Sequence, residues 1–268
     1  MRIGFNFTRS EVLPIANKLL NDGHIDYYEI LIDNFLHLDP HELLATIKCP
    51  VSFHIMRSRF LENDRESLSQ MAEQIRYHAH ILKPIYISDH LASFSCNGQN
   101  LSFLSEIDYR NRKVLIEKAS WWQEQIGEKL FLENFPSILD GGFEAPEFFS
   151  DLRREVGTGL LFDISNAVCS EINCGASTES WISEANETRH FHVGSYEPSV
   201  SDPNVMIDTH GTEISVETLS FLSDLRSSLC HSETTITYER DRNVEYDSIV
   251  QDITRIRQQL TLQKNAVK

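Results

Sequence analysis

Residues 111–135 read NRKVLIEKASWWQEQIGEKLFLENF, and this stretch contains one complete structural unit. Its first part carries apolar side chains at helical spacing, on one stripe formed by Leu115, Ala119, Trp122 and Ile126. Gly127 follows at the position where a glycine commonly ends a helix. The next run, KLFLENF, is short and apolar, as in a buried strand. The stretch therefore predicts a helix followed by a strand that is covered on both faces.

The same alternation recurs along the whole chain. Runs expected to form strands lie at residues 3–7, 26–33, 49–55, 84–90, 129–135, 158–165, 189–195 and 234–241. Helical periodicity lies between and after them, at residues 11–23, 40–48, 66–83, 111–127, 145–157, 177–185, 215–229 and 249–260. Strands separated by helices must run parallel, and eight of them close naturally into a barrel. We therefore expect an α/β fold, a (β/α)8 TIM barrel that forms one domain over residues 1–268 with its active site at the C-terminal mouth.

The charge of the chain narrows the classes of partner. The 268 residues carry 24 Lys and Arg against 40 Asp and Glu, a formal net charge of −16. Such a charge repels phosphate backbones and anionic lipids, so we expect no nucleic-acid partner and no membrane association. The chain has no apolar stretch typical of a signal peptide or of a membrane span. A reduced, cytoplasmic protein fits the five cysteines, which form no Cys-x-x-Cys pair: Cys49, Cys96, Cys169, Cys174 and Cys230.

Ionisable side chains end six consecutive predicted strands. The sequences FHI, ISDH, FLE, LFD, HFH and TYE supply, in chain order, His54, His90, Glu133, Asp163, His192 and Glu239. A single polar residue at a strand end usually serves as a cap or lies at the surface. Six of them in one barrel mouth would be costly to bury together unless cations compensated their charge. The set therefore predicts a metal site.

A long segment after the seventh strand adds further candidates. Residues 194–213 are expected to be irregular, and a loop of that length in a compact domain is usually functional or disordered. Within it, Asp208 and His210 stand two residues apart, on one side of an extended segment. Asn166 lies just beyond Asp163. Imidazole and carboxylate ligands without thiolate suit iron, manganese or zinc, and nine candidates exceed the need of one ion. We therefore expect two or three metals with a bridging carboxylate.

These motifs together resemble those of the multinuclear non-haem iron oxidative enzymes, a family long known as a domain of unknown function, and within it the methanobactin biosynthesis branch. The resemblance covers nearly the whole chain. It is carried by ISDHLASFS, LFLENFPS, LLFDISNAVCSEINCG, HFHVGSYE, MIDTHG and YERD. Departures from the family's pattern occur at Asp89, Ser165, Cys174 and residues 193–195. We expect the last three to alter the pocket wall more than the ligand set.

The resemblance implies an oxidase that uses dioxygen to oxidise a cysteine of a ribosomally made precursor peptide. In the methanobactin branch this cysteine becomes an oxazolone with an adjacent thioamide, which yields a copper-chelating natural product. The implied active form is a mixed-valence diiron pair with a third iron nearby. A small partner protein of the methanobactin C type is expected to form a heterocomplex with the chain and to help hold the leader peptide.

Carried over to this chain, the resemblance gives each candidate a role. Glu133 would bridge two irons. The first would also be held by His54 and His90, the second by Asp163, His192 and Glu239, and the third by Asp208, His210 and Asn166. Asp241 lies two residues beyond Glu239, on the same side of an extended chain, and would act as a base near the substrate.

Two other functions fit the same residues. Barrels of the endonuclease or sugar-isomerase type use similar His, Glu and Asp sets with zinc or manganese for hydrolysis or isomerisation. The acidity of the chain argues against a DNA substrate. In a non-catalytic binding subunit, the ions would only organise the barrel. Bound iron would favour the oxidase, colourless zinc would favour the hydrolase, and oxygen consumption with a peptide would argue against the binding subunit.

Overall fold

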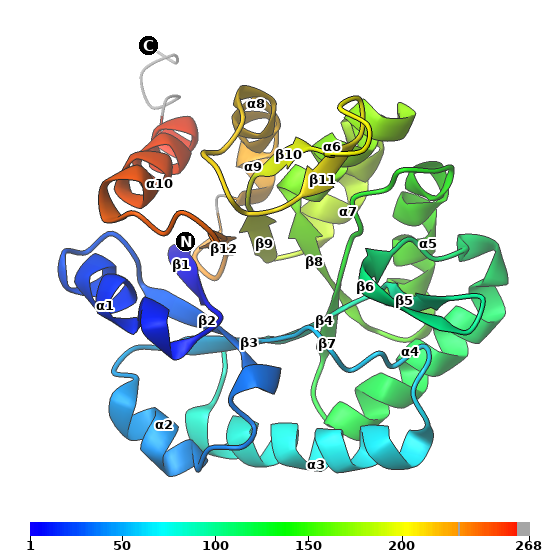
Figure 1. The fold of residues 1–268 in the computed structure, drawn as a ribbon, viewed down its shortest axis with the longest axis horizontal. Coiled ribbons are helices and arrows are strands. Elements are labelled where there is room, and N and C mark those ends of the chain that lie inside the picture. Colours follow the sequence, from blue (N-terminus) through cyan, green and yellow to red (C-terminus); the bar gives the residue numbers. More distant parts are fainter. Residues whose placement is uncertain (230, 262–268) are drawn as a thin grey trace.

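Eight parallel strands close into a barrel in the computed structural model, which describes residues 1–229 and 231–261 (Figure 1). The barrel strands are β1 (Arg2–Phe7), β2 (Tyr27–Leu31), β3 (Val51–Ile55), β4 (Ile87–His90), β7 (Leu130–Glu133), β8 (Gly159–Asp163), β9 (His190–Val193) and β12 (Thr235–Tyr238). They pair in the order β1-β12-β9-β8-β7-β4-β3-β2, and β2 pairs with β1 to close the ring. The prediction of a (β/α)8 barrel is therefore confirmed. Cys230 and residues 262–268 of the expected domain lie outside the described residues.

Helices surround the barrel, as Figure 1 shows. They are α1 (Leu13–Asn21), α2 (Pro40–Thr46), α3 (Arg65–Leu82), α4 (Arg112–Ile126), α5 (Gly141–Glu155), α6 (Ile164–Cys174), α7 (Ile182–Glu187), α8 (Val216–Asp224), α9 (Arg226–Leu229) and α10 (Tyr246–Thr261). α4 ends as its sequence predicts, because Gly127 takes a left-handed conformation with a φ of 77°. The prediction of one helix over 215–229 is wrong. Leu225 has a ψ of 4°, far from the helical value, and separates α8 from α9.

Two antiparallel hairpins extend the loops that follow β4 and β9. The first pairs β5 (Ser93–Cys96) with β6 (Gln99–Ser105), and the second pairs β10 (Tyr196–Pro198) with β11 (Met206–Asp208). The prediction of an irregular segment over 194–213 is therefore wrong in part. Both hairpins follow the C-terminal ends of barrel strands, which is the end where active sites of this fold lie.

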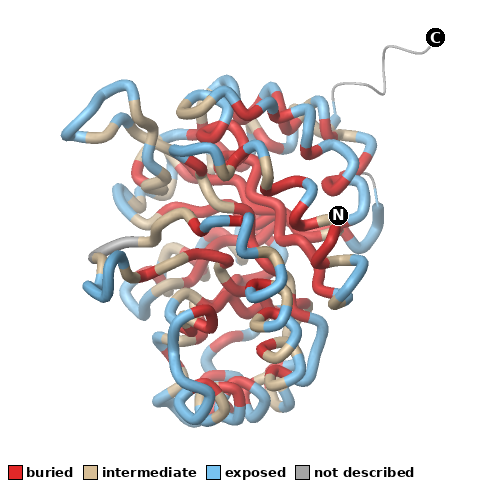
Figure 2. Tube along the Cα trace, turned by 90° about the vertical axis from the view of Figure 1, so that its right-hand side faces the viewer, coloured by how far each residue is buried: buried red, intermediate tan, exposed pale blue. Residues whose placement is uncertain are grey.

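Apolar side chains fill the layer between strands and helices, while hydroxyl groups occupy part of the barrel interior. Figure 2 shows the buried residues concentrated in the strands at the centre of the molecule. The hydroxyls of Tyr27 on β2 and Thr237 on β12 lie 2.7 Å apart, and because β1 separates these strands, this hydrogen bond crosses the interior. Gly4 on β1 leaves the necessary space, since a Cβ there would lie 2.3 Å from the Tyr27 ring. The interior is therefore partly polar, which matters for the site above it.

A buried ion pair fastens α10 to the barrel. Asp252 Oδ2 accepts hydrogen bonds from the Tyr238 hydroxyl at 2.8 Å, Arg240 Nη2 at 3.2 Å and the Ile214 backbone N–H at 3.1 Å. Asp252 is 0% exposed and Arg240 is 3% exposed. Replacing Asp252 by alanine would leave the guanidinium buried without its partner. We expect Asp252→Ala to lower the free energy of unfolding by about 3–5 kcal/mol, as measured by denaturant titration of the metal-free protein.

The matched control for this prediction is Asp247→Ala, on the same helix. Asp247 is exposed and lies in the first turn of α10. Its loss removes only a favourable interaction with the helix dipole, so the free energy of unfolding should fall by less than about 1 kcal/mol. Equal losses in the two variants would show that the buried ion pair does not fasten α10.

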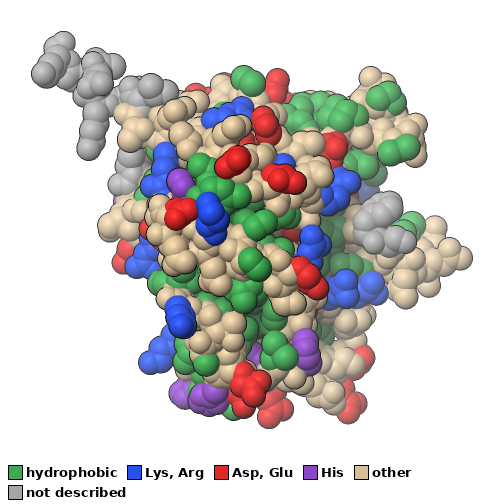
Figure 3. Space-filling view, turned by 60° about the vertical axis from the view of Figure 1, so that its left-hand side comes forward, with side chains coloured by type: hydrophobic (Ala, Val, Ile, Leu, Met, Phe, Trp, Pro, Cys, Tyr) green, Lys and Arg blue, Asp and Glu red, His purple; other side chains and the backbone are tan. Residues whose placement is uncertain are grey.

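Charged side chains are dispersed over the face of the molecule in Figure 3. Basic and acidic groups are interspersed there, so the excess of negative charge is not gathered on this face. Within residues 1–229 and 231–261, no helix combines the length and the apolar character that crossing a membrane requires.

Candidate metal centre

The C-terminal ends of the barrel strands bring the predicted side chains together. β3, β4, β7, β8 and β9, and the residue after β12, contribute in that order His54, His90, Glu133, Asp163, His192 and Glu239. The strand register places His90 opposite Glu133 and Asp163 opposite His192. Adjacent parallel strands thus deliver these groups to one end of the barrel.

One group of possible ligands comprises His54, His90 and Glu133. Glu133 Oε2 lies 3.4 Å from His54 Nε2 and 3.2 Å from His90 Nε2. The Nδ1 atom of each ring has a hydrogen-bond partner. His54 Nδ1 lies 2.9 Å from the Ser88 hydroxyl, and His90 Nδ1 lies 3.2 Å from the Ile55 carbonyl. Metal-binding histidines are commonly oriented in this way through their second nitrogen. Both rings therefore present Nε2 to the space beside Glu133.

A second group comprises Glu133, Asp163, His192 and Glu239, whose ligand atoms all lie within 4.8 Å of one another. His192 Nδ1 lies 3.2 Å from Glu133 Oε1 and 3.1 Å from Glu239 Oε2. Asp163 also caps α6, since its Oδ1 accepts the Asn166 backbone N–H at 2.7 Å. Glu133 belongs to both groups and faces each with a different oxygen. Its carboxylate has the placement that a bridging ligand requires.

Asp208 and His210 meet beside the second group. His210 Nε2 lies 2.7 Å from Asp208 Oδ1 and 3.5 Å from Glu239 Oε2. The expected extended geometry is wrong, because His210 has a left-handed backbone with a φ of 47° and turns its ring back toward Asp208. Asn166 is buried and lines the same cavity as Asp208, while its Nδ2 donates to the Asn134 carbonyl at 3.0 Å.

Buried ligand atoms without a hydrogen-bond partner are concentrated at this centre. Among the residues that the structure describes, they include Glu29 Oε1, Glu133 Oε2, Asp163 Oδ2, Asn166 Oδ1, His192 Nε2, Asp208 Oδ1, His210 Nε2 and Glu239 Oε2. Each unpaired buried polar group costs about 1–3 kcal/mol, and charged groups cost more. Imidazole nitrogens and carboxylate oxygens together suit iron, manganese or zinc. A cluster of such cations therefore fits the residues present.

The charges at the centre act strongly on one another. Burial, followed by the nearby carboxylate of Asp208, raises the pKa of Asp163 well above its usual range. Burial lowers the pKa of His54 to about 3. Although burial opposes protonation of His192, the carboxylates led by Glu239 raise the pKa of its ring. Without cations, the groups must share protons to remain buried together, and metal binding would release those protons.

Two cavities adjoin at the centre. The first, of about 200 Å³, is lined among others by Glu29, His54, Glu133, His210, Glu239 and Asp241. The second, of about 290 Å³, has apolar walls that include Leu91, Ala92, Phe135, Pro136, Met206 and Ile207. Both are lined by His90, Leu104, Glu133 and Asp208. A polar chamber and an apolar chamber therefore share the candidate ligands of the centre.

Asp241 lies at the rim of the polar chamber. Its Oδ1 accepts a hydrogen bond from Asn6 Nδ2 at 2.8 Å, and its Oδ2 lies 3.1 Å from His210 Nδ1. Arg240 turns away from the chamber, and its Nε donates to the Tyr238 hydroxyl at 2.8 Å. Although burial opposes ionisation, the hydrogen bond and charge of His210 lower the pKa of Asp241. Asp241 is thus an ionised carboxylate that touches a candidate ligand and has an exposed side-chain fraction of 39%.

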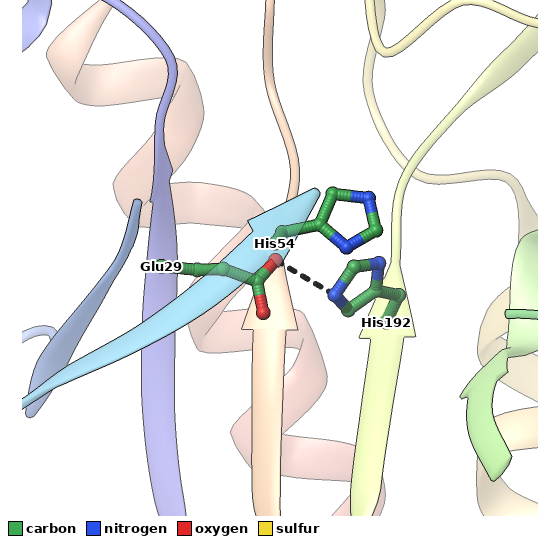
Figure 4. A group of neighbouring side chains, drawn as sticks. All are labelled: Glu29, His54 and His192. Atoms are coloured by element: carbon green, nitrogen blue, oxygen red, sulfur yellow. Dashed lines mark ion pairs between the residues drawn. The ribbon is translucent and has the colours of Figure 1, made fainter. Parts of the chain in front are cut away.

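Glu29 belongs to the centre but is absent from the predicted set. It lies in the middle of β2, is 1% exposed, and its Oε1 lies 2.7 Å from His192 Nε2 (Figure 4). With His54 and His192 it forms a third group of ligand-capable atoms. The available signal was the carboxylate itself, which interrupts the apolar run YYEIL.

Two of the positions that depart from the family's pattern, Ser165 and Gly194, contact each other near the centre. The Ser165 hydroxyl donates to the Gly194 carbonyl at 3.0 Å and accepts the Gly194 N–H at 2.9 Å. A Cβ on Gly194 would lie 2.5 Å from the His210 ring. Gly194 therefore packs directly against a candidate ligand, and the expectation that these positions alter the pocket wall more than the ligand set stays a prediction. Cys174 lies near the end of α6, where its Sγ donates to the Ser170 carbonyl at 3.1 Å.

The fold is similar to those of several solved structures, among them an endonuclease and a sugar epimerase. Endonuclease IV from Thermus thermophilus superposes with a TM-score of 0.60 and 15% identity, covering 97% of this chain and 99% of that one. D-psicose 3-epimerase gives a TM-score of 0.59 and 16% identity, covering 97% of this chain and 96% of that one. At these identities the likeness concerns the fold alone.

Comparison of sequences, unlike the likeness of folds, identifies the family of the chain. A UPF0276 protein of Psychromonas ingrahamii is 25% identical over 174 residues, which cover 62% of this chain and 61% of that protein. A UPF0276 protein of Acaryochloris marina is 24% identical over 210 residues, which cover 73% of each chain. The model of the RiPP precursor modification enzymes MbnB/TglH/ChrH matches residues 2–261. The chain therefore belongs to the MbnB/TglH/ChrH family of enzymes, which modify ribosomally made precursor peptides.

Proposed function

We propose that this chain is a multinuclear iron oxidase that uses dioxygen to convert a cysteine of a precursor peptide into an oxazolone with an adjacent thioamide, as in methanobactin biosynthesis. Family membership supports a ribosomally made peptide as the substrate. The observation that carries the metal part of the proposal is the placement of Glu133, whose two oxygens face two different groups of possible ligands. A single-metal enzyme would not need that arrangement.

In this proposal the two groups that share Glu133 hold an iron pair. Asp208, His210 and Asn166 would hold a third iron. When bound, iron supplies the redox chemistry with dioxygen and an open coordination position for the substrate thiolate.

The side chains around the centre have separate tasks in the proposal. The apolar chamber binds a side chain that neighbours the reacting cysteine, and its walls keep water away. Asp241, ionised and within reach of the polar chamber, accepts a proton from the bound peptide. The cysteine is then held where the two chambers adjoin, so that orientation contributes to the rate.

Metal content tests the proposal. We expect protein purified without added metal to contain more than one iron per chain and to absorb visible light, because the possible ligands exceed the need of one ion. Elemental analysis and absorption spectroscopy provide the measurement. A single ion per chain would contradict the proposal, and zinc or manganese alone would favour a hydrolase or isomerase. Oxygen consumption with a cysteine-containing precursor peptide would argue against a binding subunit.

The proposal includes a small partner protein of the methanobactin C type that holds the leader peptide. It rests on the resemblance to the methanobactin branch, and a stable complex of the two proteins would support it. Full-rate modification of the peptide by the isolated, iron-loaded chain would show that the partner is dispensable.

A further inference from the structure

Glu29 is held in the barrel interior by hydroxyl groups. Its Oε2 accepts hydrogen bonds from the hydroxyls of Ser52 at 3.3 Å and Thr237 at 3.2 Å, and from that of Tyr86. All three donors are buried. These bonds satisfy one oxygen and fix the plane of the carboxylate, which leaves Oε1 directed at His192.

His192 has two different environments on its two ring nitrogens. Nδ1 faces the carboxylates of Glu133 and Glu239. Nε2 lies 2.7 Å from Glu29 Oε1, as Figure 4 shows. Among the described residues, neither His192 Nε2 nor Glu29 Oε1 has a hydrogen-bond partner. The two atoms are 2.7 Å apart, but the ring N–H does not point along the line between them. At this separation a hydrogen bond between them requires only that the ring N–H turn toward Oε1.

We infer that Glu29 is a positioning residue, which orients His192 toward the second metal position through a hydrogen bond to Nε2 and does not itself bind an ion. The inference rests on the proposed metal centre. A carboxylate on the far nitrogen of a metal-binding histidine fixes its tautomer and its ring orientation and raises its basicity. This role also gives a reason for a carboxylate at 1% exposure, where an unpaired charge would be strongly unfavourable.

The competing possibility is that Glu29, His54 and His192 bind an ion of their own. His192 would then have to bind metal through both nitrogens, because Nδ1 already faces the four-residue group. Such binding requires a ring that has lost both protons. Moreover, the oxygen that would be needed for a bidentate carboxylate is occupied by three hydroxyl donors. The geometry therefore favours positioning over direct binding.

An anaerobic titration of the metal-free protein with Co²⁺ tests the inference, because the visible absorption of Co²⁺ reports both occupancy and ligand geometry. We expect Glu29→Leu to weaken one bound ion by about 10–100-fold and to shift its absorption band. Glu29→Gln should recover part of that affinity, since its amide oxygen can accept the same hydrogen bond. The number of ions at saturation should equal that of the wild type in both variants.

Two tyrosines provide a matched pair of controls. Tyr86→Phe removes a hydroxyl that donates to Glu29 and should weaken the same ion by a smaller factor. Tyr27→Phe removes an equally buried hydroxyl that bonds to Thr237 but not to Glu29, and it should change the ion affinity less than Tyr86→Phe does. Glu184→Leu removes another buried carboxylate, paired with Arg153 on the outside of the barrel, and should lower only the thermal stability.

The outcomes separate the inference from the proposed function. If the wild type binds two or more ions and both Glu29 variants bind them with wild-type affinity, Glu29 does not position His192. If saturation falls by one ion in Glu29→Gln, Glu29 is a ligand and the positioning role is wrong. A wild-type protein that binds at most one ion overturns the metal centre itself. Should Glu29→Leu fail to fold, the Gln variant and Tyr86→Phe decide the question.

Discussion

Replacing Glu133 by alanine is expected to weaken binding at two metal positions at once, each by more than about 100-fold. The carboxylate faces His54 and His90 with one oxygen and His192 with the other. Loss of a residue that merely orients a ligand weakens metal binding by about 10–100-fold, so the loss of a bridging ligand should exceed this range at both positions. Elemental analysis after iron loading should find at most the ion beside Asp208.

Asn166→Ala is the comparison for this experiment. The Asn166 amide lines the apolar chamber beside Asp208, and in the proposal it contacts only the third ion. Its removal should therefore lower the iron content by no more than one ion per chain. Equal iron loss in the Glu133 and Asn166 variants would argue against a bridge.

Asp241→Asn should lower the rate of peptide oxidation by about 10²-fold or more, while iron at the two Glu133 positions is retained. The amide keeps the shape of the carboxylate and can still accept a hydrogen bond at the His210 ring, which lies 3.1 Å away. It cannot accept a proton from the substrate. Iron content and the mass change of the peptide, measured on the same preparation, separate the two effects.

Glu239→Gln provides the contrast, because Glu239 lies deeper in the site. Its Oε2 is 3.1 Å from His192 and 3.5 Å from His210, so its charge serves the metal positions directly. This variant should lose iron before any effect on proton transfer can be observed. An Asp241→Asn protein that stays fully active, or one that loses the iron pair, would remove Asp241 from the role of base.

Local sequence signals were sufficient for the barrel, because they repeat in every unit. α4 is an example: its apolar stripe predicted the helix, and the helix ends where Gly127 takes a left-handed conformation. No local sequence pattern predicted the hairpin of β10 and β11. It is fixed by Asn173 on α6, whose side chain exchanges two hydrogen bonds with the backbone of Met206 at 2.9 Å and 2.7 Å. Contacts between distant residues have no periodicity that a sequence could reveal.

The positions of residues at the ends of barrel strands explain which members of the centre could be predicted. Parallel strands deliver their last residues to one mouth, so His90 and Glu133 could be expected to meet from the sequence alone. Glu29 could not be predicted in this way, because it lies in the middle of β2 and approaches His192 from the barrel interior. The turn at His210 could not be predicted either, because the sequence does not reveal a positive φ at a residue other than glycine.

Metal binding at this centre would make the stability of the folded chain depend on the supply of metal, because the ions would satisfy buried ligand atoms that lack hydrogen-bond partners. An ion that binds only the folded chain adds about 2.7 kcal/mol of stability when its free concentration is 100 times its dissociation constant. This is a large share of the roughly 5–15 kcal/mol that holds a typical domain together. In a cell short of the metal, more copies would be unfolded at any moment, and proteases remove unfolded copies. The amount of this protein would then follow metal availability through degradation alone, without a dedicated regulator.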